Sequence, residues 1–224
     1  MVNIVEPKRV VRKTARAKGD RRAAIVRAAT DEFAARGFAA AGVDRIARRA
    51  RVNKALIYYY FGSKLALYRE VIALAISMLA SRLEKVASAD DTAENKIRRW
   101  VEALSTFLSD FPVVAPLMLR ELADGGKHFD PPTLRRITTI VPMVVRIVDQ
   151  GRAEGVFGDA DPLALHFMLL GSTILFTANA PIRRRVRQLG LAQPPLGVAP
   201  FVRHLQQVAL RTLRKEAHHD DSID

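Results

Sequence analysis

Apolar residues recur along this chain mostly three and four positions apart, which is the spacing of an amphipathic helix. The segment 22–33 shows this pattern first, and the segment 43–50 repeats it over a shorter length. Gly37 is expected to end the first helix in a left-handed conformation, so that Phe38 folds back on its last turn. A break at 51–53 precedes another short helix over residues 54–61. The N-terminal part therefore predicts a three-helix unit.

Longer helical repeats fill the rest of the chain. Ser63 is suited to cap a helix that runs to about Val86. Further helices are predicted over 97–111, up to about 123, over 132–154 with a kink at Pro142, over 162–180 and over 200–216, with a loop at 183–197. The sequence shows no sustained two-residue alternation, so strands are not expected. These patterns predict an all-α protein of about nine helices.

The positive charge of the chain is concentrated in its first third. Residues 1–64 hold 16 Lys and Arg against 5 Asp and Glu, whereas residues 65–224 hold 20 against 18. Such clustering favours a module that binds a polyanion, because phosphate groups attract grouped cations. The alternative is a basic tail that only improves solubility. Residues 1–20 lack apolar periodicity and are predicted to form a flexible basic arm, which either adds DNA contacts or takes no part in binding.

Composition limits the classes of protein that remain. The 224 residues include 49% hydrophobic ones, enough for a packed core, and no cysteine, which excludes thiolate catalysis and fits the cytoplasm. The N-terminus lacks the apolar run of a secretory signal. The sequence contains no nucleophile elbow, paired-histidine zinc motif or Gly-rich phosphate loop. We therefore expect no enzyme, cofactor or metal site, and expect His218 and His219 to be solvated.

The segments 43–50 and 54–61, joined by three residues, have the dimensions of a helix-turn-helix, whose second helix enters the major groove of DNA. Ile57 and Phe61 lie four apart and are expected to fix that helix to its neighbours. The opposite side then carries Lys54, Ala55 and Tyr58, which we call the recognition surface. Tyr59, Tyr60 and Lys64 are placed to reach phosphates, with core packing an equal alternative for Tyr59.

The residues 37–38, 43–47 and 52–64, which end in Tyr58-Tyr59-Tyr60-Phe61-Gly62-Ser63-Lys64, resemble the signature of the TetR family of regulators. The resemblance implies DNA contacts by Lys54, Ala55, Tyr58, Tyr60 and Lys64, less certainly by Tyr59, and places Gly42 and Val43 near the DNA backbone. This chain departs from the family pattern at Ala41-Gly42, where a hydroxyl is usual, and at Arg51, which replaces the turn glycine. Arg51 is expected to compensate by reaching the DNA backbone.

The remaining two thirds of the chain are predicted to bind an effector and to form the dimer. The segment 162–180 is apolar nearly all round and long enough for a membrane span, but pairing with a second copy explains it better. The expected interface residues are Leu163, Phe167, Leu170, Ile174, Leu205, Val208 and Leu213. An apolar effector pocket is expected to be lined by Trp100, Phe107, Phe111, Met118, Met143, Phe167 and His166. The alternative for each of these residues is that it packs in the core. Further polar candidates are Arg120, Glu121 and His128.

These expectations define the domains as a basic arm over 1–20, a DNA-binding unit over 21–66, an effector-binding and dimerisation domain over 67–217 and a disordered tail over 218–224. The predicted function is that of a sequence-specific transcriptional regulator, a cytoplasmic and nucleoid-associated homodimer. It is expected to repress from a palindromic operator and to leave it when a small, largely apolar effector binds. The alternative is a nonspecific nucleoid-type DNA-binding protein that relies on the arm.

Overall fold

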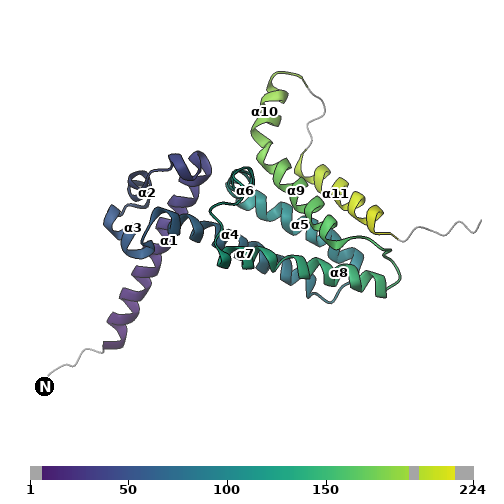
Figure 1. Ribbon diagram of the computed structural model, residues 1–224, viewed down its shortest axis with the longest axis horizontal. Helices are drawn as coiled ribbons and strands as arrows, with labels where there is room; N and C mark the ends of the chain where they lie inside the picture. The colour runs from purple at the N-terminus through teal and green to yellow at the C-terminus, as the bar shows by residue number, and fades with distance from the viewer. Residues whose placement is uncertain (1–6, 192–196, 215–224) are drawn as a thin grey trace, which may run out of the picture.

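The computed structural model describes residues 7–191 and 197–214, and within those ranges it contains eleven α-helices (Figure 1). One isolated backbone pairing, between Phe157 and Arg214, joins two segments without forming a sheet. The predicted all-α class is confirmed. The helix count exceeds the expected nine because two predicted segments divide differently, as described below.

The N-terminal unit consists of α1 (Pro7–Ala40), α2 (Val43–Ala50), α3 (Lys54–Phe61) and the beginning of α4 (Lys64–Ala87). Side chains cap two of these helices, since Asn53 Oδ1 accepts from the Leu56 amide at 2.8 Å and Ser63 Oγ from the Ala66 amide at 3.0 Å. Gly37 interrupts α1 with a φ of 72°. The chain turns there, and the Phe38 ring stacks on Phe33 with a centroid separation of 6.4 Å, as predicted.

The C-terminal part begins within α4 and contains seven more helices. They are α5 (Ala93–Asp110), α6 (Val114–Ala123), α7 (Pro131–Thr138), α8 (Val141–Ala153), α9 (Pro162–Ala178), α10 (Ala180–Gln188) and α11 (Val198–Leu213). In Figure 1, α5, α8, α9 and α11 lie together at one side of the molecule, and the N-terminal unit lies at the other. Asp161 caps α9 by accepting from the Leu163 amide at 2.8 Å.

Two hydrophobic cores share α4. Its first half supplies Leu67, Tyr68 and Ile72 to the core of the N-terminal unit, which also takes Leu117 from α6. Its last turns supply Leu83 and Val86 to the core formed with α5, α8, α9 and α11. The boundary expected at residues 66 and 67 therefore falls inside the first turn of a continuous helix, so the two parts are joined by a rigid element.

The arm expected over residues 1–20 is helical from Pro7 onward, because α1 starts there. Residues 8–18 contain Lys, Arg and Ala, which have high helix propensity, and Pro7 stands at a first position that tolerates its missing amide hydrogen. The lack of an apolar stripe led to the prediction of a flexible arm, which is wrong from Pro7 onward, because a segment without such a stripe can still continue the helix of the packed segment that follows it. Residues 1–6 and the tail expected over 218–224 lie outside the described ranges.

Two predicted boundaries in the C-terminal part are wrong. The helix expected over 132–154 is broken into α7 and α8 rather than kinked, because Pro142 cannot donate its amide and takes the first turn of a new helix. The loop expected over 183–197 begins with α10, in which Pro181 occupies the first turn and an arginine-rich run follows. A proline lies at both sites in the sequence. Whether it ends a helix or stands in the first turn of the next one depends on the residues that follow it.

Within the described ranges, no single helix is both long and apolar enough to cross a membrane. Two bent pairs satisfy the length and composition together, α5 with α6 at 99° and α9 with α10 at 48°.

Candidate DNA-binding interface

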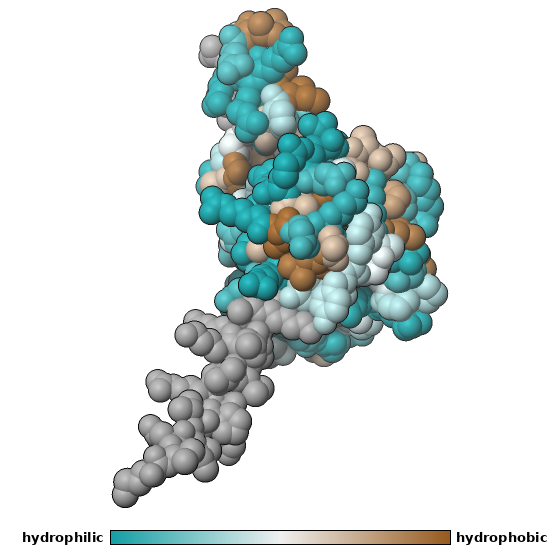
Figure 2. All heavy atoms as spheres, turned by 90° about the vertical axis from the view of Figure 1, so that its left-hand side faces the viewer, coloured by the Kyte–Doolittle hydropathy of each residue, from teal (hydrophilic) through white to brown (hydrophobic). Residues whose placement is uncertain are grey.

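The recognition surface on α3 faces outward because the other side of the helix is held in the core. Ile57 is buried and Phe61 packs against the same cluster, as their spacing predicted. Lys54, Ala55 and Tyr58 are exposed, with 42% of Tyr58 accessible. The face of the molecule that carries the N-terminal helices is mainly hydrophilic (Figure 2). The structure thus presents three neighbouring side chains in a geometry suited to a major groove.

Lys54 forms an ion pair with Asp44, the second residue of α2, and its Nζ lies 3.1 Å from Asp44 Oδ1. The hydrogen bond to Asp44 raises the pKa of Lys54, so the ammonium stays charged. Both side chains are largely exposed, and the pair is free to exchange with another anion. The cation at the start of α3 therefore has an exposed carboxylate partner that another anion can replace.

The three consecutive tyrosines take different positions. Tyr59 is 71% exposed, which excludes the core alternative, whereas Tyr60 is partly buried against the core of the N-terminal unit. Their rings meet edge to face at 5.4 Å. Lys64 Nζ donates to the Ala39 carbonyl at 3.1 Å and lies 4.8 Å from the centre of the Phe38 ring. Lys64 thereby connects the start of α4 to the end of α1.

The turn between α2 and α3 contains the one non-glycine residue with positive φ in the described ranges. Arg51 has φ 55° and ψ 44°, and its amide donates to the Arg48 carbonyl at 3.2 Å. The structure thus shows a left-handed arginine where the family pattern has the turn glycine. Its side chain is exposed on the surface next to α3. This conformation costs about 1 kcal/mol, because a Cβ disfavours it.

The start of α2 is held by Glu32 instead of a hydroxyl cap. Glu32 is 8% exposed, and its Oε1 accepts from the Gly42 amide at 3.1 Å and from Arg45 Nε at 2.5 Å. Burial by itself raises the pKa of this carboxyl, but these hydrogen bonds and the nearby Arg36 hold it below its usual value. The side chain of Val43 is buried. The predicted contact of Gly42 and Val43 with DNA is therefore possible only through their main-chain atoms.

Sequence reasoning missed Glu32. It interrupts the apolar side of the first helix just before Phe33, and a charged residue on such a side requires a partner. The partners come from another helix, ten and thirteen residues away, so their identity depends on how α1 and α2 cross.

Three of the four polar effector candidates meet where α6 joins the N-terminal unit. Arg120 donates to the carbonyls of Phe33, Ala34 and Ala35, at 3.4 Å for the first and the last. Glu121 is buried beside Tyr68 and His128. His166 lies elsewhere, on α9, where burial lowers its pKa. Arg120 satisfies the free carbonyls ahead of Gly37 and thus links α6 to α1.

The expected apolar effector residues do not surround a common cavity. Trp100 and Met143 are buried in the core formed by α4, α5, α8, α9 and α11, while Phe107 belongs to a third, smaller cluster, against which Phe111 and Met118 pack. Phe167 is 65% exposed. The core alternative considered for these residues accounts for Trp100, Phe107 and Met143.

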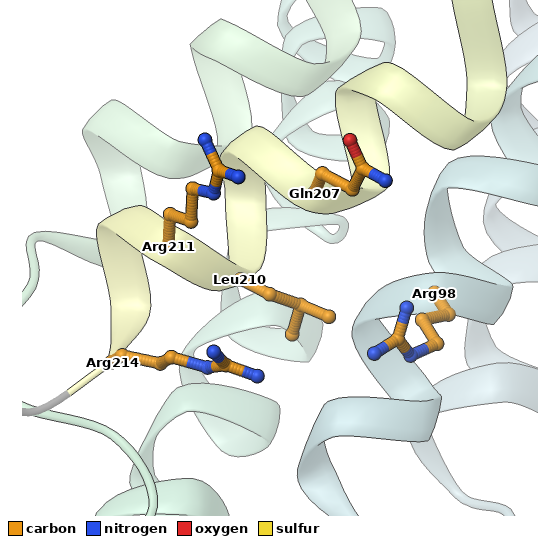
Figure 3. A pocket seen from close by; sticks show the side chains of 5 residues that line it. All are labelled: Arg98, Gln207, Leu210, Arg211 and Arg214. Atoms are coloured by element: carbon orange, nitrogen blue, oxygen red, sulfur yellow. The ribbon is translucent and has the colours of Figure 1, made fainter. Parts of the chain in front are cut away.

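Two cavities lie elsewhere in the C-terminal part. One of about 240 Å³ is lined by Ser105, Leu108, Ser109, Pro112, Thr173, Phe176, Thr177, Ala180, Arg183, Val198 and Phe201. The other, of about 190 Å³, lies between α5 and α11, where Leu210 and Arg214 extend toward Arg98, and Gln207 and Arg211 complete its lining (Figure 3). The first is mainly apolar and the second mainly cationic.

The expected interface residues divide into two groups. Leu163 and Phe167 are exposed, and Leu170 and Val208 are partly exposed. Ile174, Leu205 and Leu213 are buried inside the protomer and present no surface to a second copy, which corrects the prediction for these three. Leu175, 60% exposed on the same helix as Phe167, was not predicted. The outward apolar side of α9 is therefore rotated from the one expected.

Comparison with known proteins gives consistent results. Residues 25–71 match the family described as bacterial regulatory proteins, tetR family. The HTH-type transcriptional repressor SCO4008 of Streptomyces coelicolor is 32% identical over 74% of this chain and 82% of its own length. The HTH-type transcriptional repressor NicS of Pseudomonas putida is 26% identical over 85% of this chain and 91% of its own length.

Solved structures share the fold. A TetR family transcription regulator from Marinobacter aquaeolei superimposes with a TM-score of 0.71 over 90% of this chain and 99% of that one, at 17% identity. The regulator SCO4942 from Streptomyces coelicolor superimposes with a TM-score of 0.66 over 86% of this chain and 97% of its own, at 23% identity. The order and packing of helices are thus those of known regulators.

The role of Glu32 is testable by substitution. Glu32→Gln keeps an oxygen acceptor but removes the charge that pairs with Arg45, and it is expected to lower the free energy of unfolding by about 1–3 kcal/mol. Asp31→Asn, which removes the exposed partner of Arg49, is the matched control and should change it by less than about 0.5 kcal/mol. Urea unfolding followed by circular dichroism measures both.

The wild-type protein and Glu32→Gln also test whether the charge on Glu32 contributes to stability. Because folding lowers the pKa of Glu32 below 4.5, its stabilisation is complete above that pH and is lost as the pH falls through the lowered value. The stability difference between wild type and Glu32→Gln should therefore shrink in acid. A difference that stays constant down to about pH 3 contradicts a contribution from the carboxylate charge.

Proposed function

Because the chain belongs to the TetR family of bacterial regulatory proteins, we propose that it is a homodimeric repressor that binds a palindromic operator and leaves it when a small molecule binds. The protein is a DNA-binding transcriptional regulator. The observation that supports the proposed operator recognition is the outward recognition surface of α3, held by a buried Ile57 and a capped N-terminus.

The proposed contacts divide by chemistry. Lys54 donates to guanine acceptors in the major groove, and Ala55 and the Tyr58 ring meet thymine methyl groups. Tyr59, Tyr60, Lys64 and Arg51, with the main chain at Gly42 and Val43, contact the DNA backbone and fix the register of the helix. Two copies related by a two-fold axis place their recognition helices about 34–36 Å apart, which matches successive major grooves and a palindromic site.

Substitutions on α3 test this assignment. Tyr58→Ala and Lys54→Ala should each weaken affinity for an operator selected from genomic fragments by about fivefold or more, because each removes a base contact worth about 1–3 kcal/mol. Lys85→Ala, an exposed cation on α4, is the control and should leave affinity unchanged. Fluorescence anisotropy with the operator and a random duplex of equal length measures the effect.

The nonspecific alternative gives the opposite result in the same assay. A protein that depended on its basic N-terminal residues would lose binding on removal of residues 1–18, tolerate both α3 substitutions and bind the random duplex equally well. A specific regulator distinguishes the two duplexes by about 4–10 kcal/mol.

The proposed dimer uses the outward apolar side of α9. Leu163, Phe167 and Leu175 are exposed there, and α11 lies beside it. Large exposed apolar side chains at helical spacing favour a four-helix contact with a symmetry mate. Further exposed apolar residues, Ile182, Leu189 and Leu191, continue from this helix into α10 and the segment after it.

A charge at Phe167 tests the interface. Phe167→Glu should convert the dimer to a monomer in sedimentation velocity, because it places a carboxylate in an apolar contact. Leu134→Glu, at an exposed leucine of α7, is the control and should remain dimeric. A charge at Ile174 is uninformative because that side chain is inside the protomer. If Phe167→Glu sediments as the wild type does, the proposed interface is incorrect.

The proposed effector site is the mainly apolar cavity between α5, α9, α10 and α11. The Arg183 guanidinium lies 3.7 Å from the centre of the Phe176 ring, and Phe176 stacks on Phe201 at 3.9 Å. Ser105 Oγ, buried in the lining, has no hydrogen-bond partner among the described residues. An apolar wall with one cation and a free hydroxyl suits a small molecule with an apolar body and an anionic group.

Octanoate and its uncharged counterpart octanol test the chemical class. Octanoate should release the operator at lower concentration than octanol, because only the carboxylate pairs with the guanidinium. Arg183→Gln should raise the octanoate concentration for half release at least tenfold. Arg185→Gln, an exposed arginine of the same helix that does not line the cavity, should not. Equal potency of both probes, or an unchanged Arg183→Gln protein, contradicts an anionic effector in this cavity.

A further inference from the structure

A buried polar cluster lies where α4, α6 and the segment before α7 meet. The Tyr68 hydroxyl donates to Glu121 Oε1, and His128 Nδ1 lies 2.8 Å from the same oxygen. Glu121 is 1% exposed and His128 is 8% exposed. The second carboxylate oxygen, Glu121 Oε2, is buried and has no hydrogen-bond partner among the described residues. A buried carboxylate oxygen without a hydrogen-bond partner destabilises the fold, so a ligand that pairs with it is favoured.

The chain brings a third ligating group to this cluster. Asp124 follows the end of α6, and Gly125 and Gly126, both with φ 68°, turn the chain so that His128 folds back over Glu121. The Gly126 amide donates to the Glu121 carbonyl at 2.7 Å and fixes that turn. One ligating atom from each of Glu121, Asp124 and His128 lies within 4.8 Å of the other two. The sequence contains no paired-histidine motif that would predict this arrangement, because the turn at Gly125 and Gly126 brings the three residues together.

We propose that Glu121, Asp124 and His128 bind a divalent transition-metal ion of the Zn²⁺ class at the junction between α6 and the N-terminal unit. An imidazole nitrogen and two carboxylate oxygens are ligands that these ions accept, at bond lengths of about 2.0–2.2 Å. Two atoms bonded to one ion are at most about 4.2 Å apart, so a small rotation of the exposed Asp124 carboxylate completes the site. Water takes the remaining coordination position.

The surrounding charges are compatible with a cation. Asp124 is paired with Lys127 at 3.1 Å, and both side chains are about half exposed, so this pair yields readily to an ion. Arg69 Nε donates to the His128 carbonyl at 2.9 Å and holds the backbone of that ligand. Arg120 directs its guanidinium away, to the carbonyls of α1. The ion adds two positive charges beside two carboxylates, one of which has a buried oxygen without a hydrogen-bond partner among the described residues.

The position of the site connects it to regulation, a step that rests on the proposed function. The His128 ring lies 4.5 Å from the Phe38 ring and 5.2 Å from that of Tyr68, and Arg120 holds the end of the first segment of α1. An ion that fixes the 124–128 turn therefore favours one placement of the N-terminal unit relative to α6. By linkage, the factor by which the ion changes operator affinity equals the factor by which operator changes ion affinity.

Binding of Zn²⁺ to the full-length protein tests the site without DNA. All variants carry His218→Ala and His219→Ala, which removes the tail histidines as ligands. Isothermal titration and equilibrium dialysis are expected to give one Zn²⁺ per chain, and Co²⁺ should show the visible absorption of a low-symmetry site with a nitrogen ligand. Asp124→Asn and Glu121→Gln should each weaken binding at least tenfold. Asp149→Asn, an exposed aspartate on α8, is the control.

The possible results distinguish a failure of the proposed metal site from a failure of the proposed regulatory function. Glu121 is buried and its variant tests folding as well as binding, whereas Asp124 is exposed and its variant leaves the core intact. Absence of stoichiometric Zn²⁺, or unchanged affinity in Asp124→Asn, overturns the proposal whatever the protein does with DNA. Zn²⁺ binding with operator affinity unchanged supports the site and rejects its regulatory role.

Discussion

The arrangement of this protein depends on the continuity of α4. The helix runs without a break from Lys64 to Ala87, and its two halves are buried in different cores. Neither core is complete without its share of this helix, so the N-terminal unit cannot turn freely against the rest of the chain. Any movement of the recognition surface requires either a tilt of α4 or a repacking of one core, and interiors resist both because they are closely packed.

A second connection runs through α6. Leu117 belongs to the core of the N-terminal unit, Arg120 holds the carbonyls before Gly37, and Glu121 accepts from Tyr68 on α4. These contacts lie within one stretch of helix and reach both α1 and α4. The N-terminal unit is thus attached at two points, and a ligand that shifts α6 acts on both. This double attachment connects α6 to α1, which packs on α2, and to α4, which packs on α3.

The sequence predicted those features that depend on local periodicity. The spacing of Ile57 and Phe61 determined which side of α3 is exposed, and the capping residue Ser63 marked the start of α4. Features that depend on how helices cross were not predictable. Glu32 finds partners at the start of α2 and within it, and α5 and α6 bury Ile174 on the inward side of the apolar helix α9, so the sequence placed Ile174 on the wrong side. Aromatic residues such as Trp100 fill a core as readily as they line a pocket.

The ion pair between Asp44 and Lys54 affects how this protein responds to salt. Lys54 already carries a carboxylate as its counterion, so in the proposed complex DNA displaces a group of the protein itself rather than a dissolved anion. The slope of log affinity against log salt reflects counterions released on binding, at about 0.9 per phosphate contact. In the proposed complex Lys54 contacts a base and releases no dissolved counterion, so the phosphate contacts alone set the salt dependence of binding.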